Sequence, residues 1–264
     1  MSPSIELFGF PKPPNAPSPS GYCQKLETFL RAQPNLSKSY TYTLLSTPSS
    51  APKGKMPYIT LTNGSEGPIT LADSQFIIDH LISFGHAQDL DAELSPAQRV
   101  ESRAFQVWTD ELMYIAVVTT RFGDAWPANY AKLYESLDLP SILNYAPFKP
   151  VIMWNLRRSI MGSMRGHGVG RHSKEEVETK IREWVDGVAV KVGDNWEWFH
   201  RTAAPTQVDV VLSGFLMHFM SLDYNAEIVQ MIAGKKSLVR YTLRAVELWY
   251  PEYESLLKLL RSYL

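Results

Sequence analysis

Ser20-Gly21-Tyr22-Cys23 follows an apolar strand, residues 5–10, and opens a helix, residues 22–30. Ser20 therefore stands at the entrance of this helix, and Cys23, the single cysteine of the chain, lies three residues further on. Free backbone N–H groups and the positive end of the helix dipole favour an anion at such a position. A thiolate is an anion of this kind, whether it belongs to Cys23 or to a bound thiol ligand.

The first third of the chain alternates strand and helix signals. Aromatic and β-branched residues indicate strands, and Asn63-Gly64 indicates a hairpin turn. Asp73 and Ser74 cap a helix whose apolar residues recur at helical spacing. After the first helix, we expect a strand at residues 40–45, a loop at 46–55, strands at 58–62 and 69–71, and a helix from residue 73 onwards.

Beyond Gly85 no further strand is indicated. Ser95-Pro96 is a good helix start, because Ser caps a helix and Pro fits its first position. Helices are expected at residues 96–122, 175–192, 206–220, 227–233, 236–247 and 252–263. The stretch 126–170 contains prolines and glycines, so we expect it to be irregular. Its prolines are Pro127, Pro140, Pro147 and Pro150.

Length and composition suit a two-domain globular protein. The 264 residues are 45% hydrophobic and carry a formal net charge of −1, so we expect no nucleic-acid partner. The change of pattern indicates a first domain at 1–84, a linker at 85–94 and an all-helical domain at 95–264. A lone cysteine and the lack of a visible secretory signal fit a reducing, cytoplasmic setting. No stretch is apolar enough for a transmembrane segment, and we expect 208–220 to be a buried core helix.

The order of these elements resembles the thioredoxin fold, and the helical domain behind it makes the chain similar to the glutathione transferase superfamily. Three motifs carry this resemblance: Ser20-Gly21-Tyr22-Cys23 in place of a C-x-x-C or S-x-x-C pair, Lys55-Met56-Pro57-Tyr58 in place of the cis-proline loop, and Asp73-Ser74-Gln75-Phe76-Ile77. Thr206-Gln207-Val208-Asp209 matches the capping box of the superfamily's core helix. The resemblance implies an α/β thioredoxin-like N-terminal domain and an all-α C-terminal domain.

A narrower resemblance concerns the metaxin-like branch, which contains failed-axon-connections and cadmium-resistance-type proteins. Its most specific part is Gly168-Val169-Gly170-Arg171-His172-Ser173-Lys174-Glu175-Glu176. Two histidines, His167 and His172, are too few for a metal site, so we expect none. The segment is typical of a tight turn capped by Ser173. Animal metaxins are outer-membrane import proteins, which implies a non-catalytic alternative.

The superfamily resemblance implies glutathione as the cofactor. Met56 and Pro57, joined by a cis bond, would hold the peptide like the next strand of a sheet. Asp73 and Ser74 would hold its γ-glutamyl carboxylate, although helix capping by Asp73 explains the same pair. Lys53 or Lys55 would pair with the glycyl carboxylate, although loop lysines are usually just solvated.

The hydroxyls at the entrance of the first helix are the candidate catalytic groups. Ser20 holds the first position of the C-x-x-C pattern and would donate a hydrogen bond to a bound thiolate. Cys23 holds the second position, as either a nucleophile or an inert core residue. Tyr22 and Ser18 are the alternative hydroxyl donors.

The substrate side of the site is expected to be apolar. Phe10, Met113, Tyr114 and Trp126 are the candidate contacts, although Met and aromatic residues at helical spacing are more often core. Arg121 and Arg165 could reach the same region, but the pattern favours a solvated face for both.

Together these features predict a glutathione transferase-like enzyme of detoxification or secondary metabolism. It would stabilise the glutathione thiolate and add it to an apolar electrophilic small molecule, or isomerise or eliminate through the adduct. A homodimer is usual in the superfamily. Two alternatives stay open: a non-catalytic metaxin-like binding or scaffold protein, and a transferase fold used for chemistry without glutathione.

Overall fold

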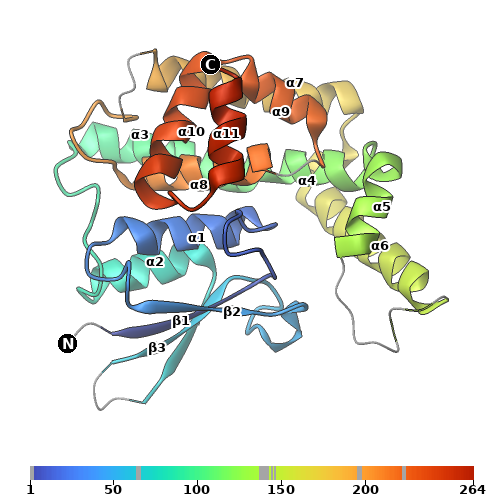
Figure 1. The fold of residues 1–264 in the computed structure, drawn as a ribbon, viewed down its shortest axis with the longest axis horizontal. Helices are drawn as coiled ribbons and strands as arrows, with labels where there is room; N and C mark the ends of the chain where they lie inside the picture. Colours follow the sequence, from blue (N-terminus) through green and yellow to red (C-terminus); the bar gives the residue numbers. More distant parts are fainter. Residues whose placement is uncertain are drawn as a thin grey trace.

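A computed structural model describes residues 3–63, 67–136, 143, 145, 147–194, 198–221 and 224–264. Within them, a four-stranded sheet with two helices is followed by a helical region that lies against those helices (Figure 1). The hairpin turn expected at Asn63-Gly64 runs into residues outside the described ones, and Pro140 also lies outside them.

The N-terminal domain is built on a sheet with the strand order β2-β1-β3-β4. The strands are β1 (Ser4–Gly9), β2 (Tyr40–Leu44), β3 (Tyr58–Thr62) and β4 (Ile69–Ala72). β1 runs parallel to β2 and antiparallel to β3, which pairs antiparallel with β4. The helices α1 (Gly21–Ala32) and α2 (Ser74–Ser83) lie on the face of the sheet that looks toward the helical region (Figure 1). The predicted thioredoxin-like arrangement is confirmed.

After Ala72, the described residues contain helices and no strand, as the sequence predicts. The long helix expected at residues 96–122 is one helical run with a π-helical segment, η2, in its middle. The helical elements are α3 (Pro96–Val107), η2 (Trp108–Met113), α4 (Tyr114–Phe122), α5 (Trp126–Ser136), α6 (Phe148–His167), η4 (Val169–Arg171), α7 (Lys174–Val192), α8 (Gln207–Ser221), α9 (Ala226–Ala233), α10 (Lys236–Trp249) and α11 (Glu254–Ser262). A short 3-10 helix, η1 (Pro48–Ser50), lies in the loop before β3.

The expectation that 126–170 is irregular is wrong, because this stretch contains α5 and α6. The two helices stand out from the body as an arm (Figure 1). Pro127 and Pro150 fall in the first turns of their helices, where a backbone N–H has no helical acceptor to lose. Gly162 and Gly166 sit in α6 with nothing close to them, and each costs the helix only about 1 kcal/mol.

The core of the molecule is the crossing of α1 and α8. From Gly21 to Leu30, every residue of α1 except Tyr22 is buried, and α8 is buried along almost its whole length. The buried core helix expected at 208–220 is therefore confirmed. Asp209, in the first turn of α8, pairs with Thr206 as predicted, since its carboxylate accepts hydrogen bonds from the backbone N–H and the hydroxyl of Thr206 at 2.8 and 2.6 Å.

Two glycines allow the helices to approach each other. A Cβ at Gly214 would lie 2.9 Å from the Cα of Lys25, which is closer than real Cβ contacts come. A Cβ at Gly21 would lie 2.5 Å from the ring of Phe215. The contact of α1 with α8 therefore requires bare backbone on both sides.

We predict that Gly214→Ala destabilises the protein by about 1–3 kcal/mol, because the added methyl group meets backbone that cannot move aside. The measurement is urea-induced unfolding followed by circular dichroism. Gly162→Ala is the matched control: it adds the same methyl group to an exposed helix position, so its stability should stay level or rise by about 1 kcal/mol. Equal stability of the two variants would contradict the prediction.

Candidate functional site

Three connections of the α/β domain leave the sheet at the same end of its strands. Tyr58, the first residue of β3, pairs with Phe8 near the end of β1 and with Ala72 at the end of β4. The chain therefore places the segment after β1, the residues just before β3 and the start of α2 next to one another. These segments carry the three motifs that the sequence singled out.

Ser20 is the N-cap of α1. Its hydroxyl accepts a hydrogen bond from the backbone N–H of Cys23 at 3.4 Å, and its own N–H donates to the Ser18 hydroxyl at 3.3 Å. Ser20 is 6% exposed. Because the hydroxyl oxygen accepts the capping bond, its proton remains available as a donor.

Cys23 is fully enclosed. Burial raises the pKa of its thiol, and the hydroxyls of Ser20 and Ser18 and the backbone of Phe10 act against that rise. A sealed thiol with a raised pKa is a core residue and not an accessible nucleophile. Phe10 contacts the surroundings of Cys23 through its backbone. Its carbonyl also accepts a hydrogen bond from the Tyr42 hydroxyl at 3.4 Å.

Tyr22 points away from a ligand thiol and into the domain junction. Its hydroxyl donates to the carbonyl of Asp110 at 2.7 Å, and its ring packs edge-on against Tyr114 with centroids 4.7 Å apart. Burial raises the pKa of Tyr22 well above its usual value. Tyr114 lies beside the start of α1, since a Cβ at Gly21 would lie 3.0 Å from its ring. The Ser20 side chain opposes the rise that burial gives to the pKa of Tyr114.

The peptide bond between Met56 and Pro57 is cis, as the resemblance implies. Both residues are buried, while Lys55 beside them is exposed. The backbone N–H and C=O of Met56 hydrogen bond to none of the described residues. Lys55 likewise forms no ion pair within the described part of the chain.

Asp73 and Ser74 have different surroundings. Asp73 is exposed, adopts φ 83° and caps α2 through hydrogen bonds from the N–H groups of Gln75 and Phe76 at 3.0 and 3.4 Å. The capping role weighed for Asp73 is therefore present. Ser74 is 5% exposed, and its hydroxyl bonds to no described residue. It is thus an unused hydrogen-bonding group at a helix N-terminus.

Two of the expected substrate contacts lie away from this end of the sheet. Met113 is completely buried in the hydrophobic core and has no surface to offer a ligand. Trp126 begins α5 and stacks on Phe122 with centroids 5.8 Å apart, and Arg157 lies over its ring. Trp126 therefore lies at the root of the arm, whereas Tyr114 lies beside Ser20.

Comparison with known proteins agrees with the fold and the motifs. The family model of the glutathione S-transferase N-terminal domain matches residues 21–129. The chain is similar to Failed axon connections of Drosophila melanogaster, with 29% identity over 96% of this chain and 59% of that protein. A metaxin-1 homologue of Caenorhabditis briggsae shares 24% identity over 80% of this chain and 64% of its own length.

In its fold and in its N-terminal family match, the chain is similar to the glutathione transferases. Among solved structures of the superfamily, a glutathione transferase of Bombyx mori has a TM-score of 0.50 at 14% identity, covering 99% of this chain and 98% of that chain, which shows a shared fold. The isoprene-epoxide–glutathione S-transferase of Rhodococcus sp. strain AD45 is 27% identical over 70% of this chain and 74% of its own length. The chain spans only 59% of the length of Failed axon connections.

Two buried polar clusters join the halves of this superfamily fold. In the first, the Lys25 ammonium lies 2.5 Å from the Asp110 carboxylate and 3.0 Å from the side-chain oxygen of Gln75. Burial raises the pKa of Asp110, and Lys25 acts against the rise. This pair connects α1 with η2 and with α2 directly beside Ser74.

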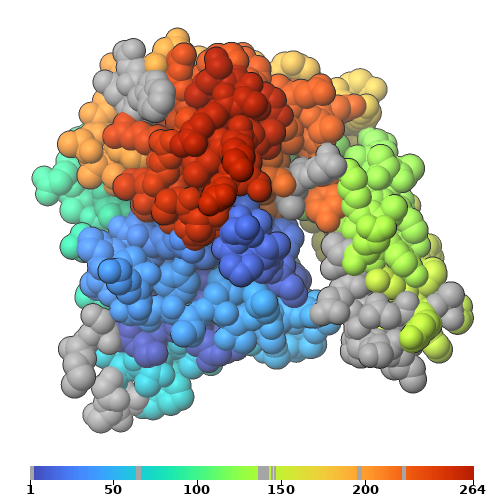
Figure 2. Space-filling view, viewed as in Figure 1, coloured from blue at the N-terminus to red at the C-terminus, as the bar shows by residue number. Residues whose placement is uncertain are grey.

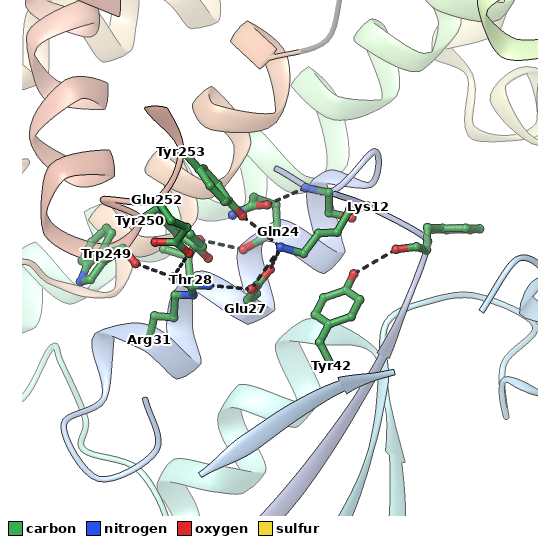
Figure 3. A network of polar contacts seen from close by, with 12 residues as sticks. Lys12, Gln24, Glu27, Thr28, Arg31, Tyr42, Trp249, Tyr250, Glu252 and Tyr253 are labelled. Carbon is green, nitrogen blue, oxygen red and sulfur yellow. Dashed lines mark hydrogen bonds and ion pairs between the residues drawn. The ribbon is translucent and has the colours of Figure 1, made fainter. Parts of the chain in front are cut away.

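The second cluster surrounds Glu27 of α1, as Figure 3 shows. The Glu27 carboxylate lies 3.0 Å from the Lys12 ammonium and accepts hydrogen bonds from Tyr40 and Arg31 at 3.2 and 3.4 Å. Arg31 also donates to the carbonyl of Trp249 at 2.8 Å. The cluster ties α1 and the segment before it to the connection between α10 and α11.

A third cluster contains two residues that the sequence did not identify as functional. Arg121 was expected to be solvated, but it is 5% exposed, while Arg165 is exposed as expected. The Arg121 guanidinium lies 3.3 Å from Nε2 of His218 in α8. Nδ1 of His218 lies 3.0 Å from the carbonyl of Ser18. An apolar pattern on every face of α8 gave no periodic signal that would have marked His218.

No described helix is both long and apolar enough to cross a bilayer. The tight turn at Gly168 is confirmed, since Ser173 caps α7 in a capping box with Glu176. Across the part of the chain that the structure describes, no three His, Cys, Asp or Glu side chains gather as a metal site would require.

We predict that His218 makes the protein acid-sensitive. Burial and the Arg121 charge lower the pKa of His218 from 6.5 to about 3, whereas the unfolded chain binds a proton near pH 6.5. Stability should therefore fall as the pH drops below about 6.5, by up to about 1.4 kcal/mol per pH unit. Urea unfolding between pH 7 and pH 4 measures this slope. His218→Gln should remove this part of the slope, and an identical slope in both proteins would contradict the prediction.

Proposed function

We propose that the protein is a glutathione-binding transferase that stabilises the glutathione thiolate for attack on a small electrophile. The observation that supports the proposal is the strand register at one end of the sheet, from which the segments that carry Ser20, Met56 and Ser74 depart. Each of these residues offers a group that the described part of the chain leaves unused: a hydroxyl proton on Ser20, a backbone edge on Met56 and a hydroxyl on Ser74.

The three groups suit the parts of glutathione. The peptide would lie along Met56 as an added strand. Its γ-glutamyl carboxylate would bind the hydroxyl and the backbone N–H of Ser74, where the helix dipole adds to the attraction. Lys55 is exposed beside Met56 and would pair with the glycyl carboxylate.

Ser20 would supply the chemistry. Its hydroxyl would donate a hydrogen bond to the thiolate, which lowers the pKa of the bound thiol because the charged form is the one that accepts the bond. Tyr22 is engaged with Asp110 and Cys23 is sealed, so Ser20 is the better candidate of the three. Tyr114 lies beside the start of α1 and would contact the electrophile.

A non-catalytic binding role is the second candidate function. The similarity to Failed axon connections and to a metaxin homologue supports it. The capping of α1 by the Ser20 hydroxyl also supports it, because a structural role explains why the hydroxyl is there. In that case glutathione or another peptide would bind at the sheet edge without turnover. A transferase fold used for chemistry without glutathione would bind neither.

We predict that Ser74→Ala weakens glutathione binding about tenfold, because a hydrogen bond to a charged group contributes about 1.5–3 kcal/mol. Isothermal titration of the full chain with glutathione measures the Kd. Ser83→Ala, at the exposed C-terminal end of the same helix, should leave the Kd unchanged. If the wild-type protein shows no heat and no thermal stabilisation at millimolar glutathione, the proposed function fails.

We predict that Ser20→Ala lowers kcat at saturating glutathione and raises the pKa of the bound thiol, because the thiolate loses its donor. The thiolate absorbance of the protein–glutathione complex near 240 nm, followed against pH, gives this pKa. Ser83→Ala, at the exposed end of α2, serves as the matched control. An unchanged thiol pKa in Ser20→Ala would remove Ser20 from this role.

A further inference from the structure

Arg121 is a buried cation with almost all of its hydrogen-bonding capacity unused. It ends the last turn of α4 and is 5% exposed. A guanidinium has five N–H donors, and among the described residues only His218 accepts one of them, at 3.3 Å from Nη2. Nε is completely enclosed and has no partner. Such a group is costly, because the protein removes it from water without replacing the lost hydrogen bonds.

None of the described neighbours of Arg121 carries a negative charge. His218 accepts at Nε2 and donates from Nδ1 to the Ser18 carbonyl at 3.0 Å, which defines the neutral tautomer. Tyr114 has a raised pKa because of burial, so its hydroxyl keeps its proton. The Tyr224 ring lies 5.4 Å from the guanidinium and contributes only its face. Arg121 stays protonated at neutral pH, so its charge lacks a described counter-ion.

The cluster lies where three parts of the candidate site meet. Arg121 belongs to α4, His218 to α8 and Ser18 to the segment that ends at Ser20. Tyr114 stands two helical turns before Arg121 and lies beside the start of α1. Nη1 of Arg121 has no partner among the described residues and is not one of the enclosed unpaired atoms, and the residue as a whole keeps 5% of its surface exposed.

Arg121 lies at the root of the arm that α5 and α6 form. α4 ends one residue beyond Arg121, and α5 begins four residues after that. Figure 2 shows a hollow between the α/β domain and the arm of α5 and α6. A small molecule bound at this root would contact α4, the helix that carries both Tyr114 and Arg121.

We propose that Arg121 binds a carboxylate of the second substrate, so that the preferred electrophiles are carboxylic acids with an apolar body. The planar guanidinium matches a carboxylate with two parallel hydrogen bonds, and both ions gain from leaving water together. This inference rests on the proposed function, because it places the reacting carbon at the thiolate near Ser20. It replaces the purely apolar electrophile expected from the sequence.

Binding without glutathione tests the carboxylate site by itself. The full chain is titrated with 3,5-dinitrobenzoate and with 1,3-dinitrobenzene, which differ only in the carboxylate. We expect the benzoate to bind at least tenfold more tightly, and Arg121→Met to abolish this preference. Arg158→Gln, which removes an exposed positive charge from α6, should keep it. Equal binding of both probes to the wild-type protein would overturn the proposal.

Turnover tests the same site during the reaction. The substrates are 4-chloro-3,5-dinitrobenzoate and 1-chloro-2,6-dinitrobenzene. In both, the glutathione thiolate forms a C–S bond at the ring carbon, chloride leaves with the electron pair, and the thiol proton goes to solvent. Arg121→Met should lower kcat/KM at least tenfold for the carboxylate and less than threefold for the neutral compound. An equal loss for both compounds would overturn the proposal.

Two further measurements separate the possible failures. If Arg121 stabilises the fold, Arg121→Met should lower the melting temperature. If Arg121 is unpaired and serves to bind substrate, the melting temperature of Arg121→Met should stay level or rise. Should Arg121→Met not fold, Arg121→Lys keeps the charge, loses the planar fork and should still weaken the benzoate preference. Benzoate binding through Arg121 without any transferase activity would sustain this inference and defeat the proposed function. Transferase activity without a carboxylate preference would support the proposed function and defeat this inference.

Discussion

The burial of α1 on all sides is the constraint on which the rest of the structure depends. The helix lies between the sheet and α8, yet it carries Gln24, Lys25, Glu27 and Thr28 among its buried residues. A polar group in such a position must find a partner, because the cost of leaving it unpaired is a large part of the stability of a protein. Each of these side chains therefore reaches a particular atom in a neighbouring segment.

These partners lie in different parts of the chain. Gln24 accepts from the N–H of Ser18 at 2.7 Å, Lys25 meets Asp110 of η2, and Thr28 lies 3.0 Å from the Tyr250 hydroxyl before α11. The helix thereby holds the segment before it, the long helical run and the C-terminal helices in one arrangement. Since Ser20 caps this helix, the candidate site inherits the same rigidity.

Local chemistry allowed much of this to be predicted from the sequence. The succession of strands and helices along the first domain, the cap at Asp73 and the box at Ser173 each depend on residues a few positions apart, which a sequence pattern displays directly. The helices α5 and α6 were missed because proline is a helix breaker everywhere except in the first turn, and Pro127 and Pro150 stand in first turns. Both prolines fall under the exception for the first turn, so the sequence pattern did not indicate these two helices.

Burial of single side chains could not be predicted in the same way. Met113 and Arg121 lie on a helical run that touches neighbours on several sides, so apolar periodicity does not separate core from cleft. Arg121 would be solvated on an ordinary surface helix. The approach of α8 and of the segment ending at Ser20 encloses it, and these contacts join residues 97 and 200 positions apart.

The ion pair between Lys25 and Asp110 has a consequence for the modularity of the protein. The thioredoxin-like half is often regarded as a unit that could be moved between proteins, since its sheet is complete by Ala72. Here its central helix would carry Lys25 without a counter-ion, and bare backbone at Gly21, if it were separated from η2 and α8. The fold of each half therefore depends on the other, and exchange of either half with that of a relative would have to carry both sides of this pair.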